Sequence, residues 1–283
     1  MIAPFIAAIA VGISTVVDKV GLSKRSIPVR QYVPFLFLYL FFFTALATPF
    51  LGRINWSLLL SPQFLFLFLI MIVLAVAWNI FYYESLQKEK LYEFESIVML
   101  APLVTIVMSW LFFPETWDVR IGVVAVIAAL ALVWSHWDKH HIKLSHYSLN
   151  MLVAIVMLAM EDIVVTELLR DQIASPIGLY AIRTLILFGF FFAYYRPEVR
   201  RVSKTTLNVI SLSGLLGSLS MVLKYYGYQK LGIPFTALVM LAAPMAVYIG
   251  SATVIHERMK WKVVVAALII AVAIVYATAI LQG

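Results

Sequence analysis

The sequence contains no cysteine. This absence excludes disulfide bonds, a thiolate nucleophile and any metal centre with cysteine ligands. Charged residues are also scarce, because Asp, Glu, Lys and Arg together make up 12% of the chain, where a soluble domain carries about 25%. A water-exposed surface cannot be built from so few charges. The composition therefore excludes an ordinary soluble protein.

Apolar residues make up 64% of the chain and fall into long runs. Runs of about 18 to 23 residues suit a helix that crosses a bilayer, whereas strands of a membrane barrel are about ten residues long and alternate in polarity. The first run begins at Met1 without the basic segment or cleavage site of a signal peptide, so we expect a retained span. The sequence predicts an all-α integral membrane protein with ten transmembrane helices, at residues 2–20, 32–51, 64–86, 92–113, 119–136, 148–169, 176–195, 206–228, 234–255 and 262–281.

The net charge of +7 comes from Lys and Arg residues, most of which lie in the short connections after the odd-numbered spans. Because positive loops are retained in the cytoplasm, this distribution predicts that both termini lie outside. No basic patch interleaved with aromatic residues is present, so we expect no nucleic-acid partner. No feature of the sequence predicts an oligomeric state.

The two halves of the chain repeat one pattern, because FYYESLQKEKLYEFESIVMLAPL aligns with LKYYGYQKLGIPFTALVMLAAPM when the chain is slid along itself. The matched pairs are Tyr83 with Tyr225, Gln87 with Gln229, Lys88 with Lys230, Pro102 with Pro244, Ser109 with Ser251 and Glu115 with Glu257. A unit of five helices, an odd number, places its second copy upside down in the membrane. The sequence therefore predicts two inverted five-helix repeats, residues 1–136 and 147–283, joined by a linker at 137–146.

This repeated pattern resembles the drug/metabolite transporter superfamily, specifically its EamA-like ten-helix family. In each copy, a helix ends in aromatic residues, the next helix contains a proline, and a glutamate precedes the following helix, over Tyr82–Glu115 and Lys224–Glu257. The resemblance covers nearly the whole chain. It implies a non-enzymatic transporter of a small metabolite in a bacterial cell membrane. Family members usually have both termini in the cytoplasm, opposite to the loop charges, so two orientations stay open.

Ionisable residues at membrane depth are candidates for the functional site, because each costs roughly 2.5 to 3.5 kcal/mol to insert. Glu161 and Asp162 lie near the centre of the sixth predicted span, and we expect at least one to face the interior. They are candidates for coupling transport to protons or for binding a cationic substrate. The alternative is an internal ion pair that only joins helices. Arg183 and Lys224 are candidates to pair with these acids or to bind a substrate carboxylate.

Glu95 shares a helix face with Pro102, and its repeated position is Ala237, so this acid is an addition to the repeated scaffold. Its position favours a special role, although an acid near a helix N-terminus also complements the helix dipole. Trp78 and Tyr82 share a face of the third span and are candidates to stack on a substrate ammonium group, or simply to pack. Acids outnumber bases at membrane depth when Asp18, Glu84 and Glu93, near the interface, are included. This balance favours cationic or zwitterionic substrates.

The fifth and tenth spans lack ionisable residues within their apolar runs, so we expect these two helices to be peripheral and the others to line the path. A cluster in the predicted linker carries only a weak metal signal, and we expect neither a metal nor another cofactor. Its members are His136, Asp138, His140, His141 and His146.

The leading hypothesis is a secondary transporter of an amine, amino acid or related metabolite that works by alternating access, with proton coupling through Glu161, Asp162 or Glu95. One alternative is a facilitative quaternary-ammonium importer with a cation cage of Trp78, Tyr82 and an acid. An intramembrane lipid-modifying enzyme is an alternative of another class, against which no nucleophile elbow or metal-ligand spacing lies within a span. A receptor or scaffold that does not transport also stays open.

Overall fold

The computed structural model describes the chain at residues 2–24, 27–59, 61–89, 91–136, 145–170, 174–199, 202–250 and 261–282. Within these ranges the secondary structure is helical except for one isolated β-bridge between Ile54 and Ala174. The helices are α1 (Ile2–Lys19), η1 (Val20–Lys24), α2 (Val29–Leu51), α3 (Trp56–Leu59), α4 (Pro62–Lys88), α5 (Leu91–Val98), α6 (Ala101–Phe112), η2 (Pro114–Thr116), α7 (Val119–His136), α8 (His146–Arg170), α9 (Pro176–Tyr195), α10 (Lys204–Leu231), α11 (Ile233–Met240), α12 (Ala243–Gly250) and α13 (Trp261–Gln282).

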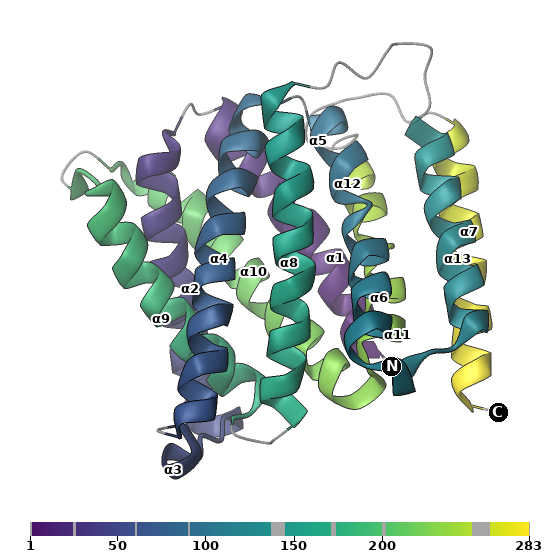
Figure 1. Cartoon of the computed structure of the whole chain (residues 1–283). Helices are drawn as coiled ribbons and strands as arrows, with labels where there is room; N and C mark the ends of the chain where they lie inside the picture. The colour runs from purple at the N-terminus through teal and green to yellow at the C-terminus, as the bar shows by residue number, and fades with distance from the viewer. Residues whose placement is uncertain are drawn as a thin grey trace.

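The long helices stand side by side in one bundle, and both chain ends lie at the same end of it (Figure 1). Among the residues that the structure describes, six helical segments are long and apolar enough to cross a membrane. Each of the ten predicted spans overlaps one described helix or a consecutive pair of helices. The chain is therefore an all-helical membrane protein. The six apolar segments are Ile2–Ser23, Val29–Leu51, Pro62–Lys88, Pro176–Tyr195, Lys204–Leu231 and Ile233–Gly250.

Two predicted spans are not single helices. The span predicted at 92–113 consists of α5 and α6, separated by a turn at Met99 and Leu100, and the described part of 234–255 consists of α11 and α12, separated by a turn at 241–242. A proline follows each turn at the second position of the new helix. Because proline has no backbone N–H, the helical hydrogen bond four residues back cannot form. Each of these two predicted spans is therefore interrupted by a turn.

The helix pairs with the most extensive contacts join distant parts of the chain. Helix α1 packs on α10, α4 packs on α8, α2 packs on α9, and α7 packs on α13. Gly12 lets α1 approach α12 closely, because a Cβ atom there would lie 2.5 Å from the Cβ of Ala246. Helices α7 and α13 stand together at one side of the bundle (Figure 1). This placement confirms that the fifth and tenth predicted spans are peripheral.

Candidate functional site

A cavity of about 190 Å³ lies within the bundle, and residues of α1, α2, α4, α5, α6 and α8 to α12 line it. No residue of α7 or α13 in the described part of the chain contributes to its wall. The cavity brings together six of the seven predicted site residues, namely Trp78, Tyr82, Glu95, Asp162, Arg183 and Lys224. The seventh, Glu161, contacts two of these six. Helices far apart in the sequence thus place the predicted residues around one space.

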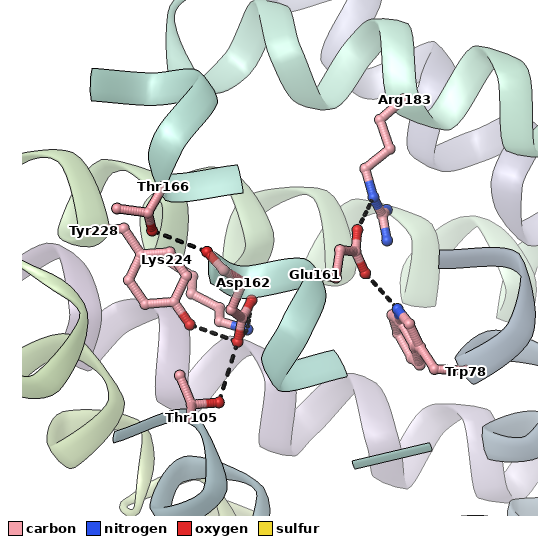
Figure 2. A network of polar contacts seen from close by, with 8 residues as sticks. All are labelled: Trp78, Thr105, Glu161, Asp162, Thr166, Arg183, Lys224 and Tyr228. Atoms are coloured by element: carbon pink, nitrogen blue, oxygen red, sulfur yellow. Dashed lines mark hydrogen bonds and ion pairs between the residues drawn. The ribbon is translucent and has the colours of Figure 1, made fainter. Parts of the chain in front are cut away.

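Asp162 on α8 forms a buried, fully satisfied cluster (Figure 2). The Lys224 ammonium lies 2.8 and 2.9 Å from its two carboxylate oxygens, Oδ1 and Oδ2. The Tyr228 hydroxyl donates to Oδ2 at 2.8 Å, and the Thr105 hydroxyl donates to the same oxygen at 3.4 Å. Lys224 and Tyr228 are one helical turn apart on α10, which is why both reach one carboxylate. The charge of Asp162 is therefore neutralised inside the protein.

Glu161 has different partners from its neighbour, because adjacent positions on a helix point about 100° apart. Its Oε1 lies 2.5 Å from the Nε of Arg183 on α9, and the indole N–H of Trp78 on α4 donates to Oε2 (Figure 2). The Nη2 of Arg183 is buried without a hydrogen-bond partner. The sequence left two alternatives for Arg183 and Lys224, and both pair with acids of α8. Whether they also contact a substrate stays a prediction.

Glu95 on α5 differs from the two acids of α8. Its side chain is 2% exposed, it lines the cavity, and its Oε1 has no hydrogen-bond partner. Among the residues that the structure describes, none forms a salt bridge with it. The neighbouring Phe94 packs edge-on against Tyr82, with ring centroids 5.0 Å apart, and Tyr82 packs edge-on against Trp78 at 5.8 Å. The three predicted residues Trp78, Tyr82 and Glu95 therefore form one side of the site.

Asp18, near the end of α1, is a cavity residue that we did not select from the sequence. Its side chain is 4% exposed and lines the cavity, and its Oδ1 accepts hydrogen bonds from the hydroxyls of Tyr32, at 2.5 Å, and Ser213. The adjacent Lys19 does not neutralise it, because Lys19 donates to the backbone carbonyls of Leu86 and Glu89. We placed Asp18 near the interface. The signal that could have found it is Ser14, which lies one helical turn earlier and marks a polar face on α1.

A stripe of small and polar residues on α10 faces the same cavity. Ser213, Gly217, Lys224 and Tyr228 line the cavity. Ser220 lies on the same stripe but donates to the backbone carbonyl of Ala7 at 2.9 Å. The stripe therefore serves two purposes, because it forms the cavity wall and also joins α10 to α1.

The histidine cluster of the predicted linker lies mainly outside the described residues, which omit 137–144. Within the parts that are described, no group of three or more metal-ligating side chains occurs. Glu257, the partner of Glu115 in the sequence repeat, also lies outside the described residues.

The chain is similar to one known protein family and to a solved structure. The model of the EamA-like transporter family matches residues 1–135. A solved structure described as "Crystal structure of protein" has a TM-score of 0.71 with this chain, covering 97% of this chain and 96% of its own at 14% identity. At that identity the likeness shows a shared fold alone. No curated protein sequence matches the chain.

The fold and the cavity define a polytopic helical membrane transporter. Residues 1–135 are an EamA-like transporter domain of the drug/metabolite transporter superfamily, as the sequence resemblance predicted. This matched domain is that of a transmembrane, non-enzymatic transporter, and its family carries out secondary transport of small metabolites. The alternative of a lipid-modifying enzyme is wrong for this reason.

Proposed function

We propose that the chain carries a small organic cation or zwitterion, such as an amine or an amino acid, across a bacterial cell membrane. The observation that supports this most strongly is the buried Glu95 carboxyl, which has an unpartnered oxygen at the cavity wall. A buried charge without a partner is unfavourable, so a cationic group that enters the cavity gains a strong electrostatic interaction there. Phosphate groups would be repelled by the same carboxylate.

The balance of charge around the cavity supports the same substrate class. The ion pairs Glu161–Arg183 and Asp162–Lys224 each sum to zero charge. The two remaining acids, Asp18 and Glu95, have no cationic partner among the described residues. The cavity wall therefore holds more acids than bases that could neutralise them, which favours a substrate that carries positive charge.

Two further groups suit particular parts of such a substrate. The perpendicular rings of Trp78 and Tyr82 present an aromatic surface beside Glu95, and an aromatic face attracts an ammonium group. The unpartnered Nη2 of Arg183 is a donor for a carboxylate, which supports a zwitterionic substrate such as an amino acid. The proposed roles are thus ammonium binding for Glu95 and the aromatic rings, and carboxylate binding for Arg183.

We further propose that two inverted halves, residues 1–136 and 147–283, exchange outward-open and inward-open arrangements. Matched positions of the sequence repeat support this mechanism. The Gln87 side chain donates to the carbonyl of Ile27 at 3.0 Å, and its counterpart Gln229 donates to the carbonyl of Leu169 at 3.4 Å. Helices α4 and α10, which carry these glutamines near their C-terminal ends, run in opposite directions (Figure 1). Each contact lies within its own half, so these two contacts, here called the glutamine latches, fix equivalent helix ends at opposite ends of the bundle.

The interrupted helices support the same two-fold relationship. The turn before Pro102 and the turn before Pro244 occupy equivalent places in the repeat. Helix α1 packs on α10 as α4 packs on α8, and the sequence repeat exchanges these two pairs. Transporters with inverted repeats bind their substrates between the halves at discontinuous helices. Both turns border the cavity, where Met99 and Met240 form part of the wall.

We assign proton coupling to Glu95, because Glu161 and Asp162 are engaged in ion pairs. Two further titratable groups line the same cavity, the Tyr82 hydroxyl on α4 and the Asp18 carboxyl on α1. A proton and a cationic substrate would then compete for one carboxylate. Such competition exchanges protons for substrate across the membrane.

Reconstituted vesicles test the proposed function. Vesicles that contain the purified protein and an unlabelled amine or amino acid should accumulate the labelled compound by exchange, and a pH gradient should alter the rate. Glu95→Gln should abolish most of this exchange. Glu84→Gln is the matched control, because Glu84 lies on α4 outside the cavity wall. Absence of exchange for every amine and amino acid, with and without a pH gradient, would overturn the proposal.

A second candidate is a facilitative importer of quaternary ammonium compounds, which the adjacent rings of Trp78 and Tyr82 beside Glu95 favour. A quaternary ammonium group cannot donate hydrogen bonds, so it depends on aromatic faces and a nearby carboxylate. A thermal-shift titration separates the candidates. Stabilisation by choline-like compounds and not by primary amines would select the importer.

A further inference from the structure

We propose that Asp18 and Glu95 form a two-carboxylate subsite around Tyr82 that selects substrates with two ammonium groups at the ends of a short chain. This inference rests on the proposed function and narrows its substrate class. The subsite consists of the Asp18 carboxyl on α1, the Glu95 carboxyl on α5 and the Tyr82 ring on α4, and all three residues line the cavity.

The two carboxyl groups belong to one site. Asp18 and Glu95 line the same cavity, and both are more than nine-tenths buried. Tyr82 lines the cavity together with both acids. Since Tyr82 is fixed by edge-on packing against Phe94 and Trp78, it holds a defined position relative to both acids.

Each carboxyl presents an unused oxygen. The Oε1 of Glu95 is buried and has no hydrogen-bond partner. Both hydroxyls that donate to Asp18, those of Tyr32 and Ser213, reach its Oδ1. In the described part of the chain, no hydrogen bond is made to the Oδ2 of Asp18. The donors therefore hold the Asp18 carboxyl in one orientation and leave an acceptor for a ligand.

The charges favour two ammonium groups over one. Glu161 and Asp162 are neutralised by their own partners, so Asp18 and Glu95 are the two acids of the cavity wall that have no basic partner among the described residues. A substrate with a single positive charge leaves one buried carboxylate uncompensated, which is unfavourable. A substrate with two ammonium groups compensates both carboxylates and relieves the repulsion between them.

The volume of the cavity suits a short chain. A protein cavity of about 150 Å³ accommodates benzene, which has six non-hydrogen atoms. The cavity here is about 190 Å³. Cadaverine has about seven non-hydrogen atoms and putrescine about six, close to the number in benzene. Both diamines therefore match the volume of this cavity.

Isothermal titration of the purified full-length chain tests this inference with matched probes. Cadaverine carries two ammonium groups, and aminopentanol is nearly the same molecule with one ammonium replaced by a hydroxyl. We expect cadaverine to bind about tenfold more tightly than aminopentanol or better, which corresponds to ~1.4 kcal/mol. Asp18→Asn and Glu95→Gln should each remove most of this preference. Glu84→Gln should keep it.

Equal binding of cadaverine and aminopentanol to the unmodified chain would overturn the two-carboxylate subsite, and that comparison needs no variant. The proposed function would survive this result, because aminopentanol binding shows a cation site. If Asp18→Asn changed only the pH dependence of binding and kept the cadaverine preference, Asp18 would be a proton site and the inference would fail. Absence of binding by any amine, together with absence of vesicle exchange, would instead count against the proposed function.

Discussion

Glu161 and Asp162 are neighbours on α8, yet each has its own cationic partner on a different helix. The sequence predicted that these acids lie at membrane depth, because both fall in the middle of an apolar run. It left open whether they bind substrate or pair with bases, since Arg183 and Lys224 come from helices whose rotation about their axes depends on tertiary packing. The pairing was therefore one of two predicted alternatives, and only the three-dimensional arrangement distinguishes them.

Replacement of Glu161 by Gln should destabilise the fold, because it leaves the Arg183 guanidinium buried without a counter-charge. Breaking a buried ion pair by removal of one partner costs about 3 to 5 kcal/mol. Denaturation in detergent, followed by circular dichroism, measures the change. The double substitution of Glu161 and Arg183 by Leu should recover much of the loss. A Glu161→Gln variant as stable as the unmodified chain would contradict a structural role for this pair.

The surface pair of Glu115 and Arg170 should give a pH-dependent contribution to stability. The Arg170 guanidinium, 2.6 Å from the Glu115 carboxylate, lowers the pKa of Glu115 below its ordinary value. A carboxyl whose pKa is lower in the folded state contributes stability above its unfolded pKa and loses it as the pH falls through the folded pKa. We expect Glu115→Gln to lower the unfolding temperature slightly at neutral pH. This difference should vanish in acid, and a difference that stays constant at all pH values would contradict the prediction.

At the level of helices, the sequence patterns predicted where the helices lie. They did not predict the turns that interrupt two of the predicted spans. Pro102 and Pro244 each follow a turn that divides a predicted span in two. Apolar composition continues through both turns, so a search for apolar runs cannot detect them. Both turns lie beside the cavity. Non-helical backbone at membrane depth is tolerated where it lines a cavity within the protein and is not exposed to lipid.

The two glutamine latches should bias the transporter in opposite directions. Gln87→Ala removes the contact with Ile27 at one end of the bundle, and Gln229→Ala removes the contact with Leu169 at the other. A hydrogen bond contributes about 0.5 to 1.5 kcal/mol, so each change should shift the population of open states roughly two- to tenfold. Because the chain has no native cysteine, Val98→Cys in the cavity wall provides a single labelling site.

Labelling of this cysteine with a membrane-impermeant thiol reagent, applied from each side of oriented vesicles, measures the shift. The first latch variant should raise accessibility from one side, and the second should raise it from the other. Changes of the same sign in both variants would contradict the proposed inverted mechanism.

At the level of the whole molecule, the sequence predicted the helical membrane class, the peripheral pair α7 and α13, and a transporter of the EamA family. These features depend on composition and on repeated spacing, and both can be recognised in a single sequence without a structure. The role of Asp18 could not be predicted in the same way. Its partners Tyr32 and Ser213 come from α2 and α10, and only their packing shows that this acid is buried and lines the cavity.

The central claim is that the Glu95 carboxyl is the group that binds the positive charge of the substrate. Equilibrium binding of pentylamine, a single cation, to Glu95→Gln and Glu84→Gln variants tests it most directly. We predict that Glu95→Gln weakens binding about tenfold or more, because the amide has no charge to attract the ammonium, and that Glu84→Gln binds as the unmodified chain does. Unchanged pentylamine affinity in Glu95→Gln would contradict the account.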